Sequence, residues 1–243
     1  MSRLLKSYFL SDLHLFARRS KAHAVTPDIY RAASQAHTMV LGGDIFDFKW
    51  STRASLEHSI SDSIAWLERL VEANPQCMFY YVLGNHDAHP RFVSELDRLA
   101  FRQSRMVWQP YVLQLEGCVF LHGDVVDCEP TELSIATKRQ RLDEKPPPVK
   151  SEHWMYDAVV FARLHRVAVH FVVNPATVLR KLAIYLSAQG LTAETGVQDV
   201  YFGHTHRVVD GVRYQGMTFH NGGASIKGLP FRILETKLLR VEG

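Results

Sequence analysis

The chain has few cysteines, little net charge and no long apolar run, and each shortage excludes a class of protein. Cys77, Cys118 and Cys128 are too few and too irregularly spaced for a disulfide framework or a thiolate zinc site. The net charge of +3 over 243 residues is far below the basic density of a dedicated nucleic-acid-binding protein. Asp12 and His14 interrupt the apolar start before a signal peptide or a membrane span could form. We therefore expect a soluble cytoplasmic protein.

The chain does contain a globular composition with alternating strand and helix patterns. A hydrophobic content of 47% is enough to bury a full core in a single domain over residues 1–243. Apolar residues at helical spacing predict helices over residues 55–73 and 90–101. Short β-rich runs each end in a polar cluster: SYFLSDLHL, TMVLGGDIFD, MFYYVLGNHD, CVFLHGD and DVYFGHTH. This alternation predicts an α/β fold whose polar clusters collect at the carboxyl ends of the strands.

The polar clusters supply side chains of the kind that bind metal ions. They are Asp12, His14, Asp44, Asn85, His122, His204 and His206. This mixture of oxygen and nitrogen ligands suits Mn, Fe or Zn, and manganese is the ion we expect. The set exceeds one tetrahedral site, but two ions about 3.5 to 4 Å apart would use all of it if Asp44 bridged them. Each residue alone has a structural alternative as a turn residue, a helix cap or a strand-end histidine.

Two pairs in this set are two positions apart in the sequence. Asp12 precedes His14, and His204 precedes His206. Side chains two apart in an extended segment lie on one face, so we expect each pair to converge through extended backbone. The histidines outside the motifs, among them His89, are expected at the surface.

The motifs D-x-H, G-D-x-x-D, G-N-H-D, H-G-D and G-H-T-H, in this order, resemble the calcineurin-like metallophosphoesterase superfamily. The resemblance covers strand ends from Ser11 to His206 and implies a four-layer α/β/β/α sandwich. It implies that the first ion is held by Asp12, His14, Asp44 and His206. It implies that the second ion is held by Asp44, Asn85, His122 and His204.

The same resemblance implies a catalytic role for His86 of the G-N-H-D motif. His86 would donate a proton to the leaving oxygen or stabilise charge on the phosphoryl group, after in-line attack by a hydroxide that bridges the ions. Asp47 would accept a hydrogen bond from His86 and favour its charged form. The structural alternative for Asp47 is an exposed turn acid. We interpret Asp87 and Asp124 as supporting groups rather than ligands.

The long gap between His122 and His204 indicates a helical insertion over residues 128–199. Residues 159–173 are largely apolar, with Arg163 and Arg166 on a basic stripe, and Asn174 and Pro175 begin a second helix over residues 176–187. The insertion is either a helical hairpin packed on the domain or a lid that contacts a large anionic or lipid-bearing substrate. In the second case Arg163 and Arg166 would bind substrate.

With the insertion as a lid, the chain resembles the UDP-2,3-diacylglucosamine pyrophosphatase-type hydrolases of lipid A synthesis. It departs from them at His86, where those enzymes commonly carry arginine. We expect a phosphorylated small molecule or a lipid-linked nucleotide as substrate, with peripheral contact to the inner membrane and no stable nucleic-acid partner. A nuclease would need a longer basic track. A metal-free scaffold would have lost ligands that are present here. The oligomeric state stays open.

Overall fold

The computed structural model describes residues 6–144 and 174–238 of the chain. Its first half, joined by the C-terminal strand β10, forms a sheet in the order β10-β1-β2-β3-β4, in which β1 to β4 are parallel and β10 is antiparallel to β1. The strands are β1 (Lys6–Leu10), β2 (Ala36–Leu41), β3 (Met78–Val82), β4 (Met106–Gln109) and β10 (Leu234–Glu235). The connecting helices are α1 (Ala22–Gln35), α2 (Leu56–Glu72) and α3 (Pro90–Arg102).

A second sheet follows in the order β5-β6-β7-β9-β8. Its inner strands are parallel, and both edge strands are antiparallel to their neighbours. The strands are β5 (Val112–Leu115), β6 (Cys118–Leu121), β7 (Asp199–Phe202), β8 (Val208–Tyr214) and β9 (Met217–Gly222). Between β6 and β7, the described residues form the 3-10 turns η1 (Asp124–Asp127) and η2 (Ala193–Thr195) and the helices α4 (Glu132–Glu144) and α7 (Pro175–Ala188).

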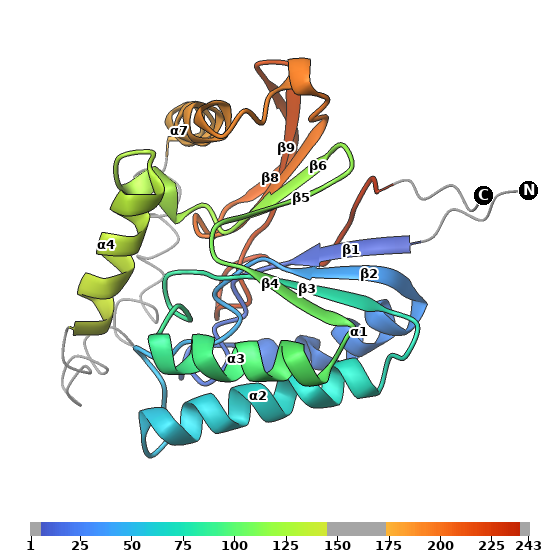
Figure 1. Cartoon of the computed structure of the whole chain (residues 1–243), viewed down its shortest axis with the longest axis vertical. Coiled ribbons are helices and arrows are strands. Elements are labelled where there is room, and N and C mark those ends of the chain that lie inside the picture. Colours follow the sequence, from blue (N-terminus) through green and yellow to red (C-terminus); the bar gives the residue numbers. More distant parts are fainter. Residues whose placement is uncertain (1–5, 145–173, 239–243) are drawn as a thin grey trace, which may run out of the picture.

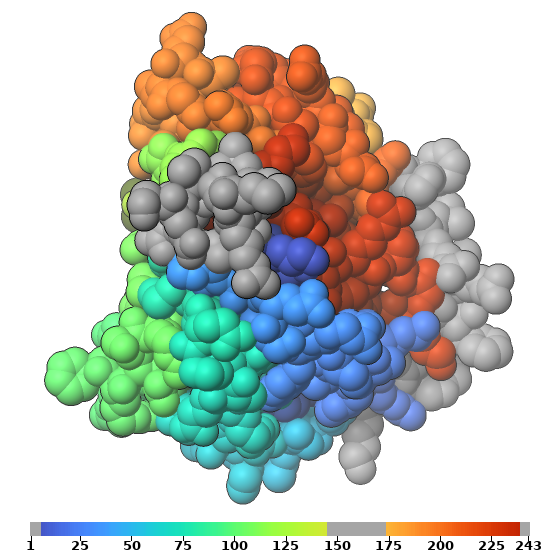
Figure 2. All heavy atoms as spheres, turned by 90° about the vertical axis from the view of Figure 1, so that its right-hand side faces the viewer, coloured from blue at the N-terminus to red at the C-terminus, as the bar shows by residue number. Residues whose placement is uncertain are grey.

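Three hydrophobic cores separate four layers. The first core packs α1, α2 and α3 against the outer face of the first sheet, and it includes Leu67 of α2 and Phe79 of β3. The second lies between the sheets and includes Phe9, Phe120 and Tyr201. The third packs α7 against the second sheet. The order helix, sheet, sheet, helix can be followed in Figure 1, and Figure 2 shows the orange and red C-terminal elements stacked above the blue and green ones. The predicted α/β/β/α sandwich is confirmed.

The helices begin where local chemistry favours a helix start. The Ser55 hydroxyl accepts the backbone N–H of His58 at the start of α2. Pro90 occupies the first turn of α3, and Asn174 caps α7 by accepting the N–H of Ala176. These three helices confirm the predictions for residues 55–73, 90–101 and 176–187. Helix α1, which contains Pro27, lies between β1 and β2, where the alternation of strands and helices indicated a helix without bounds.

The segment between β6 and β7 supplies two described helices in different places. Helix α7 covers the second sheet, whereas α4 lies beside the end of the sheets where the chain leaves the strands (Figure 1). The predicted helix over residues 159–173, with Arg163 and Arg166, lies outside the described residues. Among the helices that are described, not one is both long enough and apolar enough to cross a membrane.

Removing Phe120 tests the core between the sheets. Its ring lies 5.9 Å from that of Phe9 and 5.2 Å from that of Tyr201, between centroids. We expect Phe120→Ala to reduce the free energy of unfolding by about 3 to 5 kcal/mol in urea denaturation, because a large cavity is left. Phe101→Ala is the control, since Phe101 is 93% exposed. Equal losses of unfolding free energy in the two variants would contradict a stabilising role for the core between the sheets.

Candidate metal centre

The loops that follow β1, β2, β3, β6 and β7 meet at one end of the two sheets and carry the metal-type side chains. Two groups have potential ligand atoms within 4.8 Å of one another: Asp12 with His14 and His206, and Asp44 with His122 and His204. A third such group joins His14, Asp44 and His86. The groups are therefore adjacent rather than separate, and Asp44 belongs to two of them.

The distances place one carboxylate between the two main groups. The Asp44 Oδ2 atom is 3.3 Å from His122 Nε2 and 3.8 Å from His14 Nε2. On one side His206 Nε2 lies 3.4 Å from Asp12 Oδ1 and 3.1 Å from His14 Nε2. Asp44 thus faces histidines of both groups.

On the other side of Asp44, the amide of Asn85 completes the second group. The His122 Nε2 atom lies 3.2 Å from Asn85 Oδ1. His122 is fully buried, and Asp44 is 1% exposed. A buried carboxylate such as that of Asp44 is tolerated only when positive charge or hydrogen-bond donors compensate it.

The imidazole rings are oriented as metal-binding histidines usually are, with one nitrogen fixed by an oxygen acceptor and the other left for the ion. His122 donates from Nδ1 to the carbonyl oxygen of Gly42 at 3.1 Å. His14 donates from Nδ1 to Asp47 Oδ2 at 3.2 Å. His204 Nε2 bonds to Asp127 Oδ2 at 2.9 Å, which leaves Nδ1. This donor set fits divalent metal ions.

The backbone of the site is strained at several of these residues. Positive φ angles, uncommon outside glycine, occur at Asp12 (54°), His14 (48°), Asp44 (51°), His204 (65°) and His206 (55°). The expectation that each histidine-containing pair converges through extended backbone is therefore wrong. Strand β1 ends at Leu10 and β7 at Phe202, so the pairs lie in left-handed turns beyond the strands. Their geometry is fixed across loops, for example by the His14 N–H bound to the Asp44 carbonyl at 2.9 Å.

Two motif glycines allow these loops to approach closely. A Cβ atom at Gly84 would collide with the carboxylate of Asp44. A Cβ atom at Gly203 would collide with the carboxylate of Asp12. The glycines of the G-N-H-D and G-H-T-H motifs are therefore required by contact with the neighbouring acidic residues.

His86 is coupled to Asp47 beside the clusters. The His86 Nδ1 atom lies 3.0 Å from Asp47 Oδ1. Asp47 is fully buried, so it is not an exposed turn acid, and it also binds the N–H of Trp50 at 2.8 Å. Burial alone would lower the pKa of His86, but the charges of Asp47 and Asp44 and the hydrogen bond to Asp47 raise it to about 9. The charges of the protein itself thus favour the protonated form of His86.

Asp87 and Asp124 support the loops, as expected, and neither belongs to the clusters of potential ligands. Asp87 accepts the N–H of Ile45 at 2.9 Å, the N–H of Gly84 at 2.7 Å and the hydroxyl of Tyr81 at 2.6 Å. Burial, followed by the charge of Asp44, raises the pKa of Asp87 to about 6. Asp124 is paired with a buried arginine of α4.

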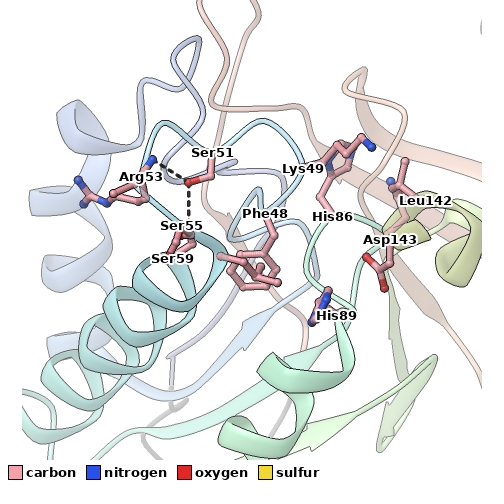
Figure 3. Close-up of a pocket in the computed structure, with 13 residues that line it drawn as sticks. Phe48, Lys49, Ser51, Arg53, Ser55, Ser59, His86, His89, Leu142 and Asp143 are labelled. Atoms are coloured by element: carbon pink, nitrogen blue, oxygen red, sulfur yellow. Dashed lines mark hydrogen bonds between the residues drawn. The ribbon is translucent and has the colours of Figure 1, made fainter. Parts of the chain in front are cut away.

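Sequence reasoning missed Asp127 and the residues of an adjoining pocket. The pocket, of about 290 Å³, opens beside Asn85 and His86 and is closed on one side by the end of α4 (Figure 3). Its apolar lining comes from Phe48, Leu56 and Leu142, its hydroxyls from Ser51, Ser55 and Ser59, and its titratable groups from Lys49, Arg53, His89 and Asp143. His89, which was expected at the surface, is half-buried here and caps α3. No motif marked these residues because they occupy ordinary loop and helix positions.

Comparison with known proteins agrees with this geometry. Residues 5–208 match the calcineurin-like phosphoesterase family. A search of curated proteins gave no match. The crystal structure of a dimetal phosphatase from Danio rerio is similar at 14% identity and a TM-score of 0.47, covering 92% of this chain and 88% of that one.

A second similar structure is Vps29 from Chaetomium thermophilum, at 13% identity and a TM-score of 0.38, covering 93% of this chain and 71% of that one. Identities and scores this low carry no argument about activity, and the assignment follows from the family match over most of the chain together with the clusters of aspartate and histidine. The chain belongs to the calcineurin-like phosphoesterase family and is a metal-dependent phosphoester hydrolase, and its clusters indicate a site for two divalent ions.

Proposed function

We propose that two divalent ions share Asp44 and that the protein uses them to hydrolyse a phosphate ester or diphosphate. In this proposal the first ion is held by Asp12, His14, Asp44 and His206. The second is held by Asp44, Asn85, His122 and His204. The observation that carries the proposal is the position of Asp44 Oδ2, 3.8 Å from His14 Nε2 and 3.3 Å from His122 Nε2.

The ions would supply the activated water and the positive charge that meets the phosphoryl oxygens. The chain itself would fix the ligands: Asp47, the Gly42 carbonyl and Asp127 each hold one histidine ring. Mixed imidazole and carboxylate ligands favour manganese over magnesium, with iron or zinc as alternatives.

His86 would act on the leaving group. Its side chain is 16% exposed and lines the pocket, and the buried charge of Asp47 keeps it protonated. A protonated imidazole beside the ions can donate a proton to the leaving oxygen or stabilise charge on the phosphoryl group.

The pocket supports a large, polar leaving group. Phe48 offers an aromatic surface, Lys49 offers positive charge, and the imidazole of His89 offers a polar ring nitrogen within the same cavity. We propose a nucleotide-linked or lipid-linked diphosphate or diester, of which the UDP-2,3-diacylglucosamine type is one candidate. A lipid-linked substrate would bring a cytoplasmic enzyme to the membrane surface. Arg163 and Arg166, proposed to contact such a substrate, lie outside the described residues.

The shared ligand can be tested by metal stoichiometry. We expect Asp44→Asn to lose both ions and His206→Ala to weaken mainly one, because the Asp44 carboxylate faces histidines of both main groups. Elemental analysis and calorimetric titration of manganese into metal-free protein would measure this. Two full equivalents retained by Asp44→Asn would refute the shared ligand.

Variants of His86 and Asp47 should differ in whether they lose metal binding as well as turnover. His86→Ala should keep its metal ions and lose about 100-fold or more in kcat, the usual scale for a proton donor or charge stabiliser. Asp47→Asn should also weaken metal binding, because Asp47 holds the ring of His14 at 3.2 Å. Because the charge of Asp47 raises the pKa of His86, the descending limb of kcat against pH should move to lower pH in Asp47→Asn. Fully additive losses in the double variant would mean that the two residues act independently.

The leaving-group pocket can be tested by comparing substrates. Lys49→Met and His89→Asn should each raise KM for a nucleoside diphosphate ester while leaving p-nitrophenyl phosphate nearly unchanged, because remote groups help only substrates that reach them. Asn at position 89 keeps a side-chain acceptor for the cap of α3. Arg98→Met is the control, since Arg98 is exposed and does not line the pocket. Equal effects on both substrates would contradict a leaving-group site.

A further inference from the structure

Helix α4 carries a buried arginine that makes four hydrogen bonds with three partners. Arg139 is 6% exposed. Its Nε and Nη2 atoms donate to both carboxylate oxygens of Asp124, at 2.8 and 3.0 Å. Nη2 also donates to the carbonyl of Leu83, and Nη1 donates to the carbonyl of Pro110, each at 2.8 Å. A single guanidinium therefore binds three separate parts of the chain: one carboxylate and two backbone carbonyls.

These partners lie next to candidate ligands of one ion. Leu83 follows β3 and precedes Asn85 by two residues. Asp124 follows His122 by two residues in the H-G-D motif. Asn85 lies in the loop after β3 of the first sheet and His122 directly follows β6 of the second, yet Asn85 Oδ1 and His122 Nε2 lie only 3.2 Å apart. The guanidinium thus ties together the two loops that must meet around this ion.

The residue before Arg139 extends the contact to a third loop. Lys138 donates from Nζ to Asp127 Oδ2 at 2.6 Å, and the same oxygen lies 2.9 Å from His204 Nε2. This pair is more exposed than Arg139 and adds less to stability. Through adjacent residues, α4 nevertheless reaches the loops of Asn85, His122 and His204.

We propose that Arg139 is a positioning residue for the ion held by Asp44, Asn85, His122 and His204. The inference rests on the ligand assignment of the proposed function. It assigns a role to α4, which the sequence places in the insertion, within the metal centre itself. Among the described residues, Arg139 makes no comparable hydrogen bonds with the loops of Asp12, His14 and His206, which would hold the other ion with Asp44.

The chemistry of the side chain makes the role specific. A guanidinium is a rigid planar fork that can bind a carboxylate and two carbonyls together, whereas a lysine ammonium is a point charge on a flexible stem. Arg139→Lys should therefore keep the charge balance with Asp124 but lose the fixed spacing of Leu83 and Pro110. Arg139→Met removes both, and it also leaves the buried Asp124 without its partner.

The test is calorimetric titration of manganese into metal-free protein, with urea denaturation in parallel. For Arg139→Met and Arg139→Lys we expect one of the two equivalents to weaken by about 10- to 100-fold, the usual effect of losing a group that orients ligands. The other equivalent should keep its affinity. The double variant Arg139→Met/Asp124→Asn removes the orphaned charge, so it should recover stability but not ion affinity.

A matched control comes from Arg105, which donates to the carbonyls of Val71 and Asn74 at 2.9 and 2.8 Å, next to the start of β4. Arg105→Met should lower the free energy of unfolding and leave both ion affinities unchanged.

The outcomes separate the inference from the proposed function. If the wild-type protein takes up fewer than two equivalents, the proposed function fails. If it takes up two, the inference is overturned when the Arg139 variants bind both ions as tightly as wild type. It is also overturned when both ions weaken equally, or when the double variant recovers full ion affinity.

Discussion

The burial of negative charge at one end of the two sheets is the constraint on which the rest of the site depends. Asp12, Asp44 and Asp47 are each at most 1% exposed, and carboxylates so deep in a protein are costly unless charge and hydrogen bonds compensate them. Imidazoles surround them, and the remaining nitrogen and oxygen atoms converge on the same space. The layers, loops and helix starts hold these groups in place against their mutual repulsion.

Close approach has a cost in backbone conformation. Aspartates and histidines of the centre occupy left-handed backbone, which is uncommon outside glycine although these two types adopt it more often than most residues. Such conformations persist only where the surrounding structure fixes them, and here they are fixed by hydrogen bonds between loops and by glycines packed against carboxylates. The rigid sandwich stabilises strain that the loops could not hold alone.

Local sequence signals predicted the α/β alternation and the identity of the side chains in the metal centre, whereas the four layers were implied by the family resemblance. Apolar runs mark β1, β2, β3, β6 and β7, and each motif directly follows its strand. The turns at Asp12 and His204 could not be predicted, because the left-handed backbone depends on contacts with other loops. Arg139 was missed for the same reason: all its partners lie at least 15 positions away in the sequence. Long-range polar contacts leave no periodic pattern.

Helix α4 serves two surfaces at once. Arg139 and Asp143 are four residues apart, so they lie one turn from each other on the same side of the helix. Arg139 reaches the loops of the metal centre, and Asp143 lines the pocket beside His86. If a molecule that enters the pocket shifted α4, it would also displace the loops that hold the ion, and the ion would change the affinity for that molecule by the same factor. The geometry of α4 thus provides a physical route by which the pocket and the metal centre would be thermodynamically linked.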